Sequence, residues 1–196
     1  MNPDIERFFD YPQLMQAAAE RFAALAAAAI AQQGRFDVAL SGGSTPAGLY
    51  RRLAAEPFAS AVDWRHVHIF WGDERCVAPD HPDSNYRVVN EALLQVVPIP
   101  AANIHRMRGE IAPKQAAAEY AQQLRILLPH PPRFDLVLLG MGADGHTASL
   151  FPDSRAVRQA VRGTQKRWVA AEPAANGRIE RLTLTTLAFN ASCRVI

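Results

Sequence analysis

The feature that most constrains the fold of this chain is an almost continuous apolar run, Phe134–Leu139, that leads straight into a glycine-rich loop. A strand that is apolar on both sides is typical of a parallel sheet covered on both faces. The loop, Gly140–Gly145, contains three glycines, which remove the Cβ atoms that would keep a ligand away from the backbone. This segment predicts a buried strand, a ligand-binding turn and the start of a helix near Thr147.

The end of this loop carries two side chains suited to proton transfer. Histidine is the side chain best suited to move protons near neutral pH, so His146 can act as a general acid or base. Asp144 can cap the helix predicted near Thr147, orient His146 or contact a ligand. A helix start also supplies free backbone N–H groups and a positive dipole end, and both favour an anion. The loop therefore predicts a catalytic site.

Two further predicted strands also end in polar loops. The strand Phe36–Leu40 leads into Ser41–Pro46, where hydroxyls and free N–H groups suit a phosphate and Pro46 suits the first helical position. This loop lacks the lysine of a Walker A motif. The strand Trp64–Trp71 leads into Gly72–Arg75. Because ligands bind beyond the carboxyl ends of parallel strands, we expect the three loops to form one site.

The remaining pattern alternates helices and strands. It predicts an α/β fold with a mostly parallel, Rossmann-like sheet and helices on both faces. The predicted helices are Tyr11–Gln33, Pro46–Ala55, Asn85–Val97 and Pro113–Leu128. Short strands are predicted at Ile104–Met107, Arg167–Ala171, Arg181–Leu184 and Arg194–Ile196. No repeat or second domain is evident, so we expect one domain over residues 1–196.

Charge and cysteine content exclude several classes of protein. The chain has a formal net charge of only +2 and no dense basic stripe, which argues against a nucleic-acid binder. The two cysteines, Cys76 and Cys193, form no CxxC pair. His66 and His68 point the same way if both lie on a strand, but the sequence places no third metal ligand beside them. We therefore expect neither a metal nor a cofactor.

The N-terminal part of the chain shows no secretory signal, since it lacks a basic region followed by an apolar core. The alanine-rich stretch Ala17–Ala31 is interrupted by Glu20 and Arg21, which suits a soluble helix better than a membrane span. We expect a cytoplasmic protein without a membrane partner, either a monomer or a weak homodimer.

Three motifs together resemble the 6-phosphogluconolactonase family: Ser41–Pro46, Trp71–Arg75 with Ser84–Tyr86, and Gly140–Pro152. That family is related in fold to glucosamine-6-phosphate deaminase and ribose-5-phosphate isomerase. The resemblance implies an enzyme of the oxidative pentose phosphate pathway that hydrolyses 6-phospho-D-glucono-1,5-lactone to 6-phospho-D-gluconate. Family members usually run a few dozen residues further, so it also implies a domain that is short at its C-terminus.

The residues and the resemblance together assign expected roles to ten positions. His146 is expected to be the general acid–base, with Asp144 or Asp73 holding its ring. The expected substrate and phosphate ligands are Gly42, Gly43, Ser44, Thr45, Arg75, Asn85 and Arg181. Glu74 stays open as an alternative to Asp73, and Arg181 is included on the strength of the resemblance.

Two other functions stay open. A sugar-phosphate isomerase or amino-sugar deaminase on the same scaffold needs a base at C2 of the sugar, which Asp73 can supply. A sugar-phosphate-binding protein without turnover is the second. Sensors of this fold normally accompany a DNA-binding helix-turn-helix, and Tyr11–Gln33 followed at once by a strand does not fit that arrangement.

Overall fold

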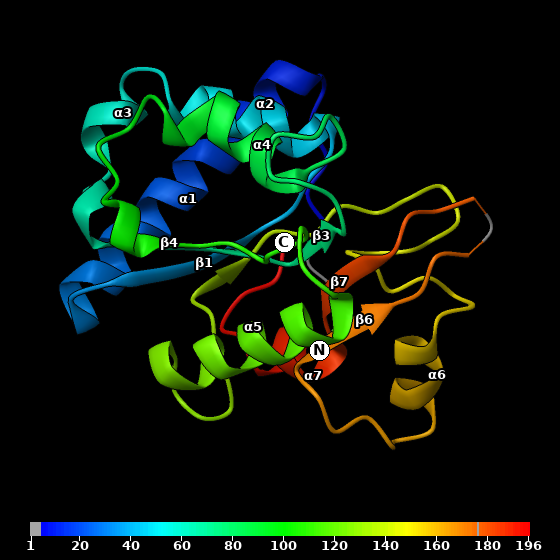
Figure 1. The fold of residues 1–196 in the computed structure, drawn as a ribbon. Helices are drawn as coiled ribbons and strands as arrows, with labels where there is room; N and C mark the ends of the chain where they lie inside the picture. The colour runs from blue at the N-terminus through cyan, green and yellow to red at the C-terminus, as the bar shows by residue number, and fades with distance from the viewer. Residues whose placement is uncertain (1–4, 176) are drawn as a thin grey trace.

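The computed structural model describes residues 5–175 and 177–196. Its centre is a parallel sheet of four strands in the order β4-β2-β1-β5 (Figure 1). The strands are β1 (Phe36–Leu40), β2 (Val67–Trp71), β4 (Ile104–His105) and β5 (Leu136–Val137). Leu40 lies beside Trp71 in the register of β1 and β2, so both strands end at one level and the loops after them are neighbours. The predicted α/β fold with a parallel sheet is confirmed.

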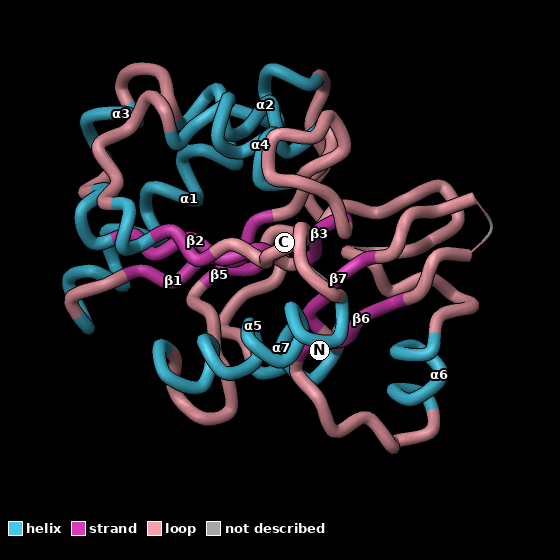
Figure 2. The backbone as a smooth tube through the Cα atoms, viewed as in Figure 1, coloured by secondary structure: helices cyan, strands magenta, loops and turns pink. Residues whose placement is uncertain are grey.

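A second, antiparallel sheet lies beside the first and is not predicted by the sequence (Figure 2). It consists of β3 (Asp73–Arg75), β7 (Arg181–Leu184) and β6 (Val169–Glu172), in the order β3-β7-β6. The polar stretch after Trp71 is predicted to be a loop, but in the structure it pairs with β7. Strand formation here depends on a partner far away in the sequence, so local propensity does not reveal it.

Helices cover both faces of the parallel sheet (Figure 1). One face carries α1 (Tyr11–Gln33), α2 (Ser44–Leu53), α3 (Phe58–Ala61) and α4 (Asn85–Val89), which continues as a π-helical turn over Asn90–Leu94. The other face carries α5 (Pro113–Leu127) and α7 (Thr186–Ala191). The remaining helix, α6 (Arg155–Val161), lies next to the second sheet. The predicted arrangement of helices on both faces is therefore correct.

The longest helix, α1, has its predicted bounds because both ends are capped. The Asp10 carboxylate accepts the Gln13 backbone N–H at 2.9 Å, and Gly34 ends the helix at a φ of 79°, which favours glycine. By length and composition α1 is long and apolar enough to cross a membrane. In the structure one stripe of α1, including Ala19 and Phe22, is buried in the core, as in a surface helix of a globular domain.

The predicted starts of α2 and β2 are wrong by a few residues. Helix α2 begins at Ser44 with Gly43 as its N-cap, two residues before the predicted start at Pro46. Pro46 consequently lies inside the first turn rather than at its first position. Trp64–His66 forms a short 3-10 turn that precedes β2 instead of being part of it. These shifts leave the order of elements unchanged.

Two predicted strands of the parallel sheet, β4 and β5, are shorter than expected, whereas β1 has its predicted bounds. Only two residues of the apolar run Phe134–Leu139 pair as β5, and β4 likewise contains two residues. The strand predicted at the end of the described chain is present in part, since Val195 bridges Val137 in parallel. The apolar run is nonetheless buried at Phe134 and through β5, as a strand covered on both faces requires.

The helix predicted near Thr147 is wrong. Ala148 adopts a left-handed φ of 48°, and the Thr147 hydroxyl donates to the carbonyl of Gly140 at 2.8 Å, so the chain turns back on itself. Helix α6 begins only at Arg155. His146 therefore lies in a loop rather than at a helix start, and Asp144 caps no helix.

Candidate active site

The three predicted loops meet in one pocket of about 280 Å³ beyond the carboxyl ends of β1 and β2. Nine of the ten predicted site residues line it: Gly42, Gly43, Ser44, Thr45, Asp73, Arg75, Asn85, His146 and Arg181. The tenth, Asp144, contacts the ring of His146 from within the same loop. A larger cavity of about 590 Å³ between β4 and α5 contains none of the ten. The smaller pocket is therefore the candidate active site.

His146 is held by a hydrogen bond between its Nδ1 and Oδ1 of Asp144, which also accepts the backbone N–H of His146 at 3.2 Å. The bond to the imidazole lowers the pKa of Asp144, so the carboxylate stays an acceptor and Nδ1 carries the proton. Nε2 is then the basic nitrogen. Gly142 makes room for this pair, because a Cβ there would run into the imidazole. Asp144 is thus the carboxylate that orients His146.

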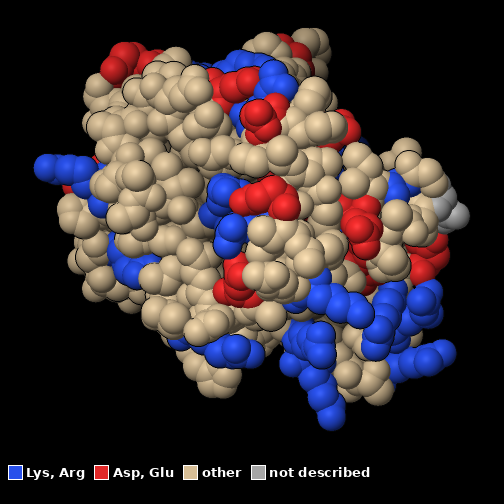
Figure 3. Space-filling model, in the orientation of Figure 1, with Lys and Arg blue, Asp and Glu red and all other residues tan. Residues whose placement is uncertain are grey.

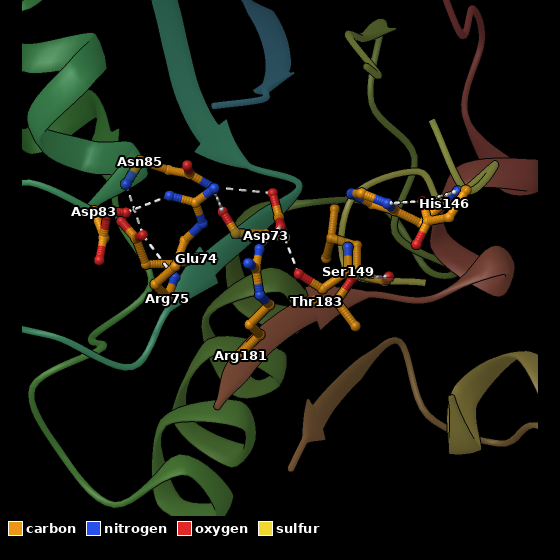
Figure 4. Close-up of polar contacts among 11 residues, drawn as sticks. Asp73, Glu74, Arg75, Asp83, Asn85, His146, Ser149, Arg181 and Thr183 are labelled. Carbon is orange, nitrogen blue, oxygen red and sulfur yellow. Dashed lines mark hydrogen bonds and ion pairs between the residues drawn. The ribbon is translucent and has the colours of Figure 1, made fainter. Parts of the chain in front are cut away.

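Asp73 is buried, and its carboxylate contacts three residues from other segments at or beside the pocket (Figure 4). Its Oδ1 accepts a hydrogen bond from Nδ2 of Asn85 at 3.0 Å, and its Oδ2 accepts one from Oγ of Ser149 at 2.6 Å. Arg181 lies 3.9 Å from Oδ2 as an ion-pair partner. Ser149 cannot be found from the sequence, because nothing near it in the chain shows that this loop serine contacts a carboxylate on the distant strand β3.

The Glu74 side chain does not line the pocket; it accepts hydrogen bonds from backbone groups beside it. Its carboxylate accepts the backbone N–H groups of Arg75 and Asn85 at 2.7 Å and of Tyr86 at 2.8 Å. These bonds anchor the start of α4 to β3. Burial raises the pKa of Glu74, while the three backbone bonds act in the opposite direction. Of the acidic pair, only Asp73 faces the pocket.

Arg75 and Arg181 are opposite each other in the pairing of β3 with β7, so two guanidinium groups enter the pocket from adjacent strands (Figure 4). The Nε atom of each is buried and has no hydrogen-bond partner among the described residues. Burial, followed by the positive charge of Arg75, lowers the pKa of Arg181. One bond of Arg75 goes to the backbone carbonyl of Asp83. Two neighbouring cations with so few partners favour an anionic ligand.

The turn after β1 supplies backbone donors to the pocket. No side chain caps α2, so the N–H groups of Ser44 and Thr45 in its first turn have no intrahelical partner. Gly42 packs against the Asn85 carboxamide at a position where a Cβ would not fit. Ser41, which is not among the predicted binding residues, also lines the pocket. Free N–H groups beside hydroxyls suit a phosphate.

A further group of basic side chains lies away from the candidate active site. Figure 3 shows Lys and Arg gathered at the lower right, over the part of the molecule that contains α6. Arg155, Arg158 and Arg162 belong to that region, and none of them lines the pocket. The cationic character of the pocket therefore comes from Arg75 and Arg181.

Within residues 5–175 and 177–196, no group of three or more His, Cys, Asp or Glu side chains is arranged to hold a metal ion. The expectation that His66 and His68 share one face of a strand is wrong, because His66 lies in the turn before β2 and bonds to Asp63. His68 on β2 instead shares a hydrogen bond of 3.1 Å with His105 on β4. The two histidines have separate partners.

A parallel α/β sheet with a polar, cationic pocket beyond its strand ends is typical of proteins that bind a small anionic molecule at that edge. Residues 10–196 match the family model described as glucosamine-6-phosphate isomerases/6-phosphogluconolactonase, and this match includes all three loops of the pocket. The chain therefore belongs to this family, as its motifs predict.

Individual relatives agree with this assignment. The chain is 50% identical over 134 residues to a 6-phosphogluconolactonase of Synechocystis sp., covering 66% of this chain and 54% of that protein. It is 38% identical over 193 residues to a probable chloroplastic 6-phosphogluconolactonase of Oryza sativa subsp. indica, covering 93% of this chain and 57% of that protein. The chain thus spans about half the length of the curated relatives it matches.

Solved structures resemble the whole described fold. The 6-phosphogluconolactonase of Trypanosoma brucei superposes with a TM-score of 0.87 at 31% identity, covering 99% of this chain and 80% of that one. The 6-phosphogluconolactonase of Thermotoga maritima has a TM-score of 0.79 at 31% identity, covering 92% of this chain and 77% of that one. The fold assignment therefore agrees between the sequence comparison and the structure comparison.

Proposed function

We propose that this chain hydrolyses 6-phospho-D-glucono-1,5-lactone to 6-phospho-D-gluconate in the oxidative pentose phosphate pathway. The observation that carries the proposal is the presence, in one pocket, of a His146–Asp144 pair and of two arginines, Arg75 and Arg181. The first pair suits proton transfer to and from water, and the second suits the phosphate of the substrate. The names of the relatives agree with this chemistry.

In the proposed reaction, Nε2 of His146 takes a proton from water as the water oxygen attacks the lactone carbonyl carbon. The bond between that carbon and the ring oxygen then breaks, and the imidazolium returns the proton to the leaving oxygen. Asp144 holds the tautomer with Nδ1 protonated and stabilises the imidazolium form. Water adds across the ester bond: one of its protons goes to the ring oxygen through His146, and the other is released when the new carboxylic acid ionises.

Backbone amides of the glycine loops are the proposed donors to the oxyanion that forms on the carbonyl oxygen. The amides of Gly142 and Gly145 already donate to carbonyls of their own loop, at 2.8 and 2.9 Å. The donors must therefore come from other amides around the pocket, including the turn at Gly42 and Gly43. Variants or a bound substrate analogue therefore need to test only these remaining amides as donors to the oxyanion.

The 6-phosphate is proposed to bind Arg75, Arg181 and the amide and hydroxyl groups of Ser44 and Thr45. Binding a remote phosphate positions the reacting carbon against His146. Asn85 is proposed to contact the sugar from the same pocket, with Asp73 holding its carboxamide. In this scheme Asp73 positions ligand-binding groups and takes no proton itself.

The isomerase or deaminase alternative gives Asp73 the role of base. Its two carboxylate oxygens already accept hydrogen bonds from Asn85 and Ser149, and Arg181 is its ion-pair partner. A carboxylate so engaged is better suited to positioning than to removing a proton from carbon. These contacts favour the lactonase over the alternative.

The test is hydrolysis of freshly generated 6-phosphogluconolactone, followed by proton release with the spontaneous rate subtracted. We expect clear acceleration by the chain, and a loss of at least about a hundredfold in kcat for His146→Ala with the fold retained. Near-normal turnover by His146→Ala would remove His146 from the mechanism. A folded chain that binds 6-phosphogluconate without accelerating hydrolysis would favour a binding protein, and sugar-phosphate isomerisation or deamination would favour the other enzymes.

A further inference from the structure

Phe151 lies directly against the imidazole of His146. The centres of the two rings are 4.4 Å apart and the ring planes are inclined by 36°. The contact arises because the chain turns back after His146, with the Leu150 N–H donating to the Thr147 carbonyl at 2.9 Å. Phe151 is almost fully buried, with 5% of its surface exposed. It is therefore a fixed surface for the imidazole and not a mobile neighbour.

Phe151 is itself held by a cation. The guanidinium carbon of Arg178 lies 3.8 Å from the centre of the Phe151 ring, and that of Arg181 lies 5.4 Å away. Arg178 is in turn paired with the carboxylate of Asp153 at 3.0 Å. A guanidinium over an aromatic face is an attractive arrangement, which strengthens when it is shielded from water. These contacts keep the Phe151 ring in one orientation.

The ring also separates two spaces. His146 lines the candidate active site, whereas Phe151 and Arg178 line a neighbouring cavity of about 200 Å³. Arg181 lines both. Without the aromatic ring, the imidazole would have room to move from the pocket toward this second cavity.

The imidazole of His146 needs a contact besides its hydrogen bond to Asp144 to hold it in place. Among the described residues, the His146 side chain forms a hydrogen bond only with Asp144, whose own side chain is 49% exposed on a glycine-rich loop. One hydrogen bond allows an imidazole to rock about the bond axis, whereas proton transfer needs Nε2 held in one place. A second contact against a rigid ring removes that freedom.

We propose that Phe151, held by Arg178, is a positioning residue that fixes the imidazole of His146 for proton transfer. This inference rests on the proposed function for its kinetic consequences, but the contact itself can be tested without a substrate. Phe151 touches no reacting atom in this scheme. Its effect is to keep the base aimed at the water molecule that attacks the lactone.

The kinetic test compares Phe151→Leu with a matched control. Phe58 is equally buried, at 5% exposure, and also lies under an arginine, with the Arg52 guanidinium carbon 4.6 Å from its ring centre, but it is not in the pocket. We expect Phe151→Leu to lower kcat about tenfold with KM changed less than about twofold, because Arg181 keeps its ion-pair partner Asp73 while the base is misaligned. Phe58→Leu should leave both constants near wild type. Phe151→Tyr keeps the aromatic ring and should restore most of kcat.

A second measurement reads the contact in the resting protein. The carbon-bound ring protons of His146, assigned by NMR through His146→Ala, should show a ring-current shift that disappears in Phe151→Leu and persists in Phe151→Tyr and Phe58→Leu. Equal losses of kcat in Phe151→Leu and Phe58→Leu, or no rescue by tyrosine, would overturn the positioning role. An unchanged His146 spectrum in Phe151→Leu would overturn the contact. If the wild-type chain hydrolyses no lactone, the proposed function fails, and the spectrum alone decides whether Phe151 orders His146.

Discussion

The hydroxyl of Ser149 donates a 2.6 Å hydrogen bond to Oδ2 of Asp73, a carboxylate 76 positions earlier in the chain. Both residues are buried, with 0% and 5% of their surfaces exposed. The bond ties the loop that carries His146 to the strand that carries Arg75. Hydrogen bonds to carboxylates are stronger than those between neutral groups, so this one sets the distance between the two halves of the pocket.

Ser149→Ala should therefore affect both stability and activity. We expect the free energy of unfolding to fall by about 1–3 kcal/mol, because a buried acceptor loses its partner. We also expect kcat/KM to fall about tenfold as Asp73 and the His146 loop shift relative to each other. Urea unfolding and the lactone assay measure the two effects.

Ser154→Ala is the matched control for Ser149→Ala. Ser154 is also buried, but its hydroxyl caps α6 by accepting the Val157 N–H at 3.2 Å and lies outside the pocket. Losing this cap should cost about 1 kcal/mol and leave kcat/KM unchanged. If the two variants have equal kcat/KM, the link between Ser149 and Asp73 has no role in activity.

Gly142→Ala should remove activity while the protein stays folded. A Cβ at this position would overlap Cε1 and Nδ1 of His146, and the imidazole, as the end of a side chain, can swing aside. We expect a loss of about a hundredfold in kcat with little change in the midpoint of thermal unfolding. In the same loop, a Cβ on Gly140 would meet no atom within 4 Å. Gly140→Ala with the same loss of kcat as Gly142→Ala would show that the loop backbone, not the space beside His146, is decisive.

Arg181→Gln should weaken recognition of the phosphate specifically. Charge-assisted hydrogen bonds are worth about 1.5–3 kcal/mol, so the preference for the phosphorylated lactone over unphosphorylated gluconolactone should fall at least tenfold. Arg162→Gln removes an equal charge from the exposed region of α6 and should leave this preference unchanged. If both variants lose the preference equally, general charge and not the pocket selects the phosphate.

Stability should fall between pH 6.5 and about 4 because of the pair His68 and His105. Burial lowers the pKa of both to about 4, with further contributions from Arg35 to each and from His68 to His105. Between their ordinary pKa of 6.5 and this value, the unfolded chain takes up protons that the folded chain does not. The free energy of unfolding therefore decreases as the pH falls through this window.

Asp37 has the opposite effect, since burial raises its pKa from 3.8 to about 6 and the folded chain then binds the extra proton. A difference measurement separates the two contributions. Urea unfolding from pH 4.5 to 7.5 should show a smaller loss toward acid for the double variant His68→Gln, His105→Gln than for the wild type. Parallel curves for the two proteins would exclude the histidine pair as a source of the acid sensitivity.

The parts of the site that the sequence predicts well are those built from neighbours along the chain. His146 and Asp144 are two residues apart on a glycine-rich loop, so their contact requires only a local turn. Gly42 and Gly43 likewise follow a strand whose apolar composition is evident in the sequence. By contrast, the helix expected at Thr147 does not form, because the Thr147 hydroxyl bonds to Gly140 and Ser149 is held by Asp73. The second of these competing contacts lies outside any local window.

Local sequence patterns predict the α/β class, the three loops of the candidate site and the family, because apolar strands, glycines and polar loop residues follow one another in a recognisable order. Which carboxylate contacts which partner depends on how the chain packs in three dimensions. The pairing of β3 with β7 places Arg75 opposite Arg181, and the return of the loop after His146 brings Ser149 to Asp73 and Phe151 to His146. The pairing of β3 with β7 and the bond from Ser149 to Asp73 join segments that are far apart in the sequence, and no local pattern encodes them.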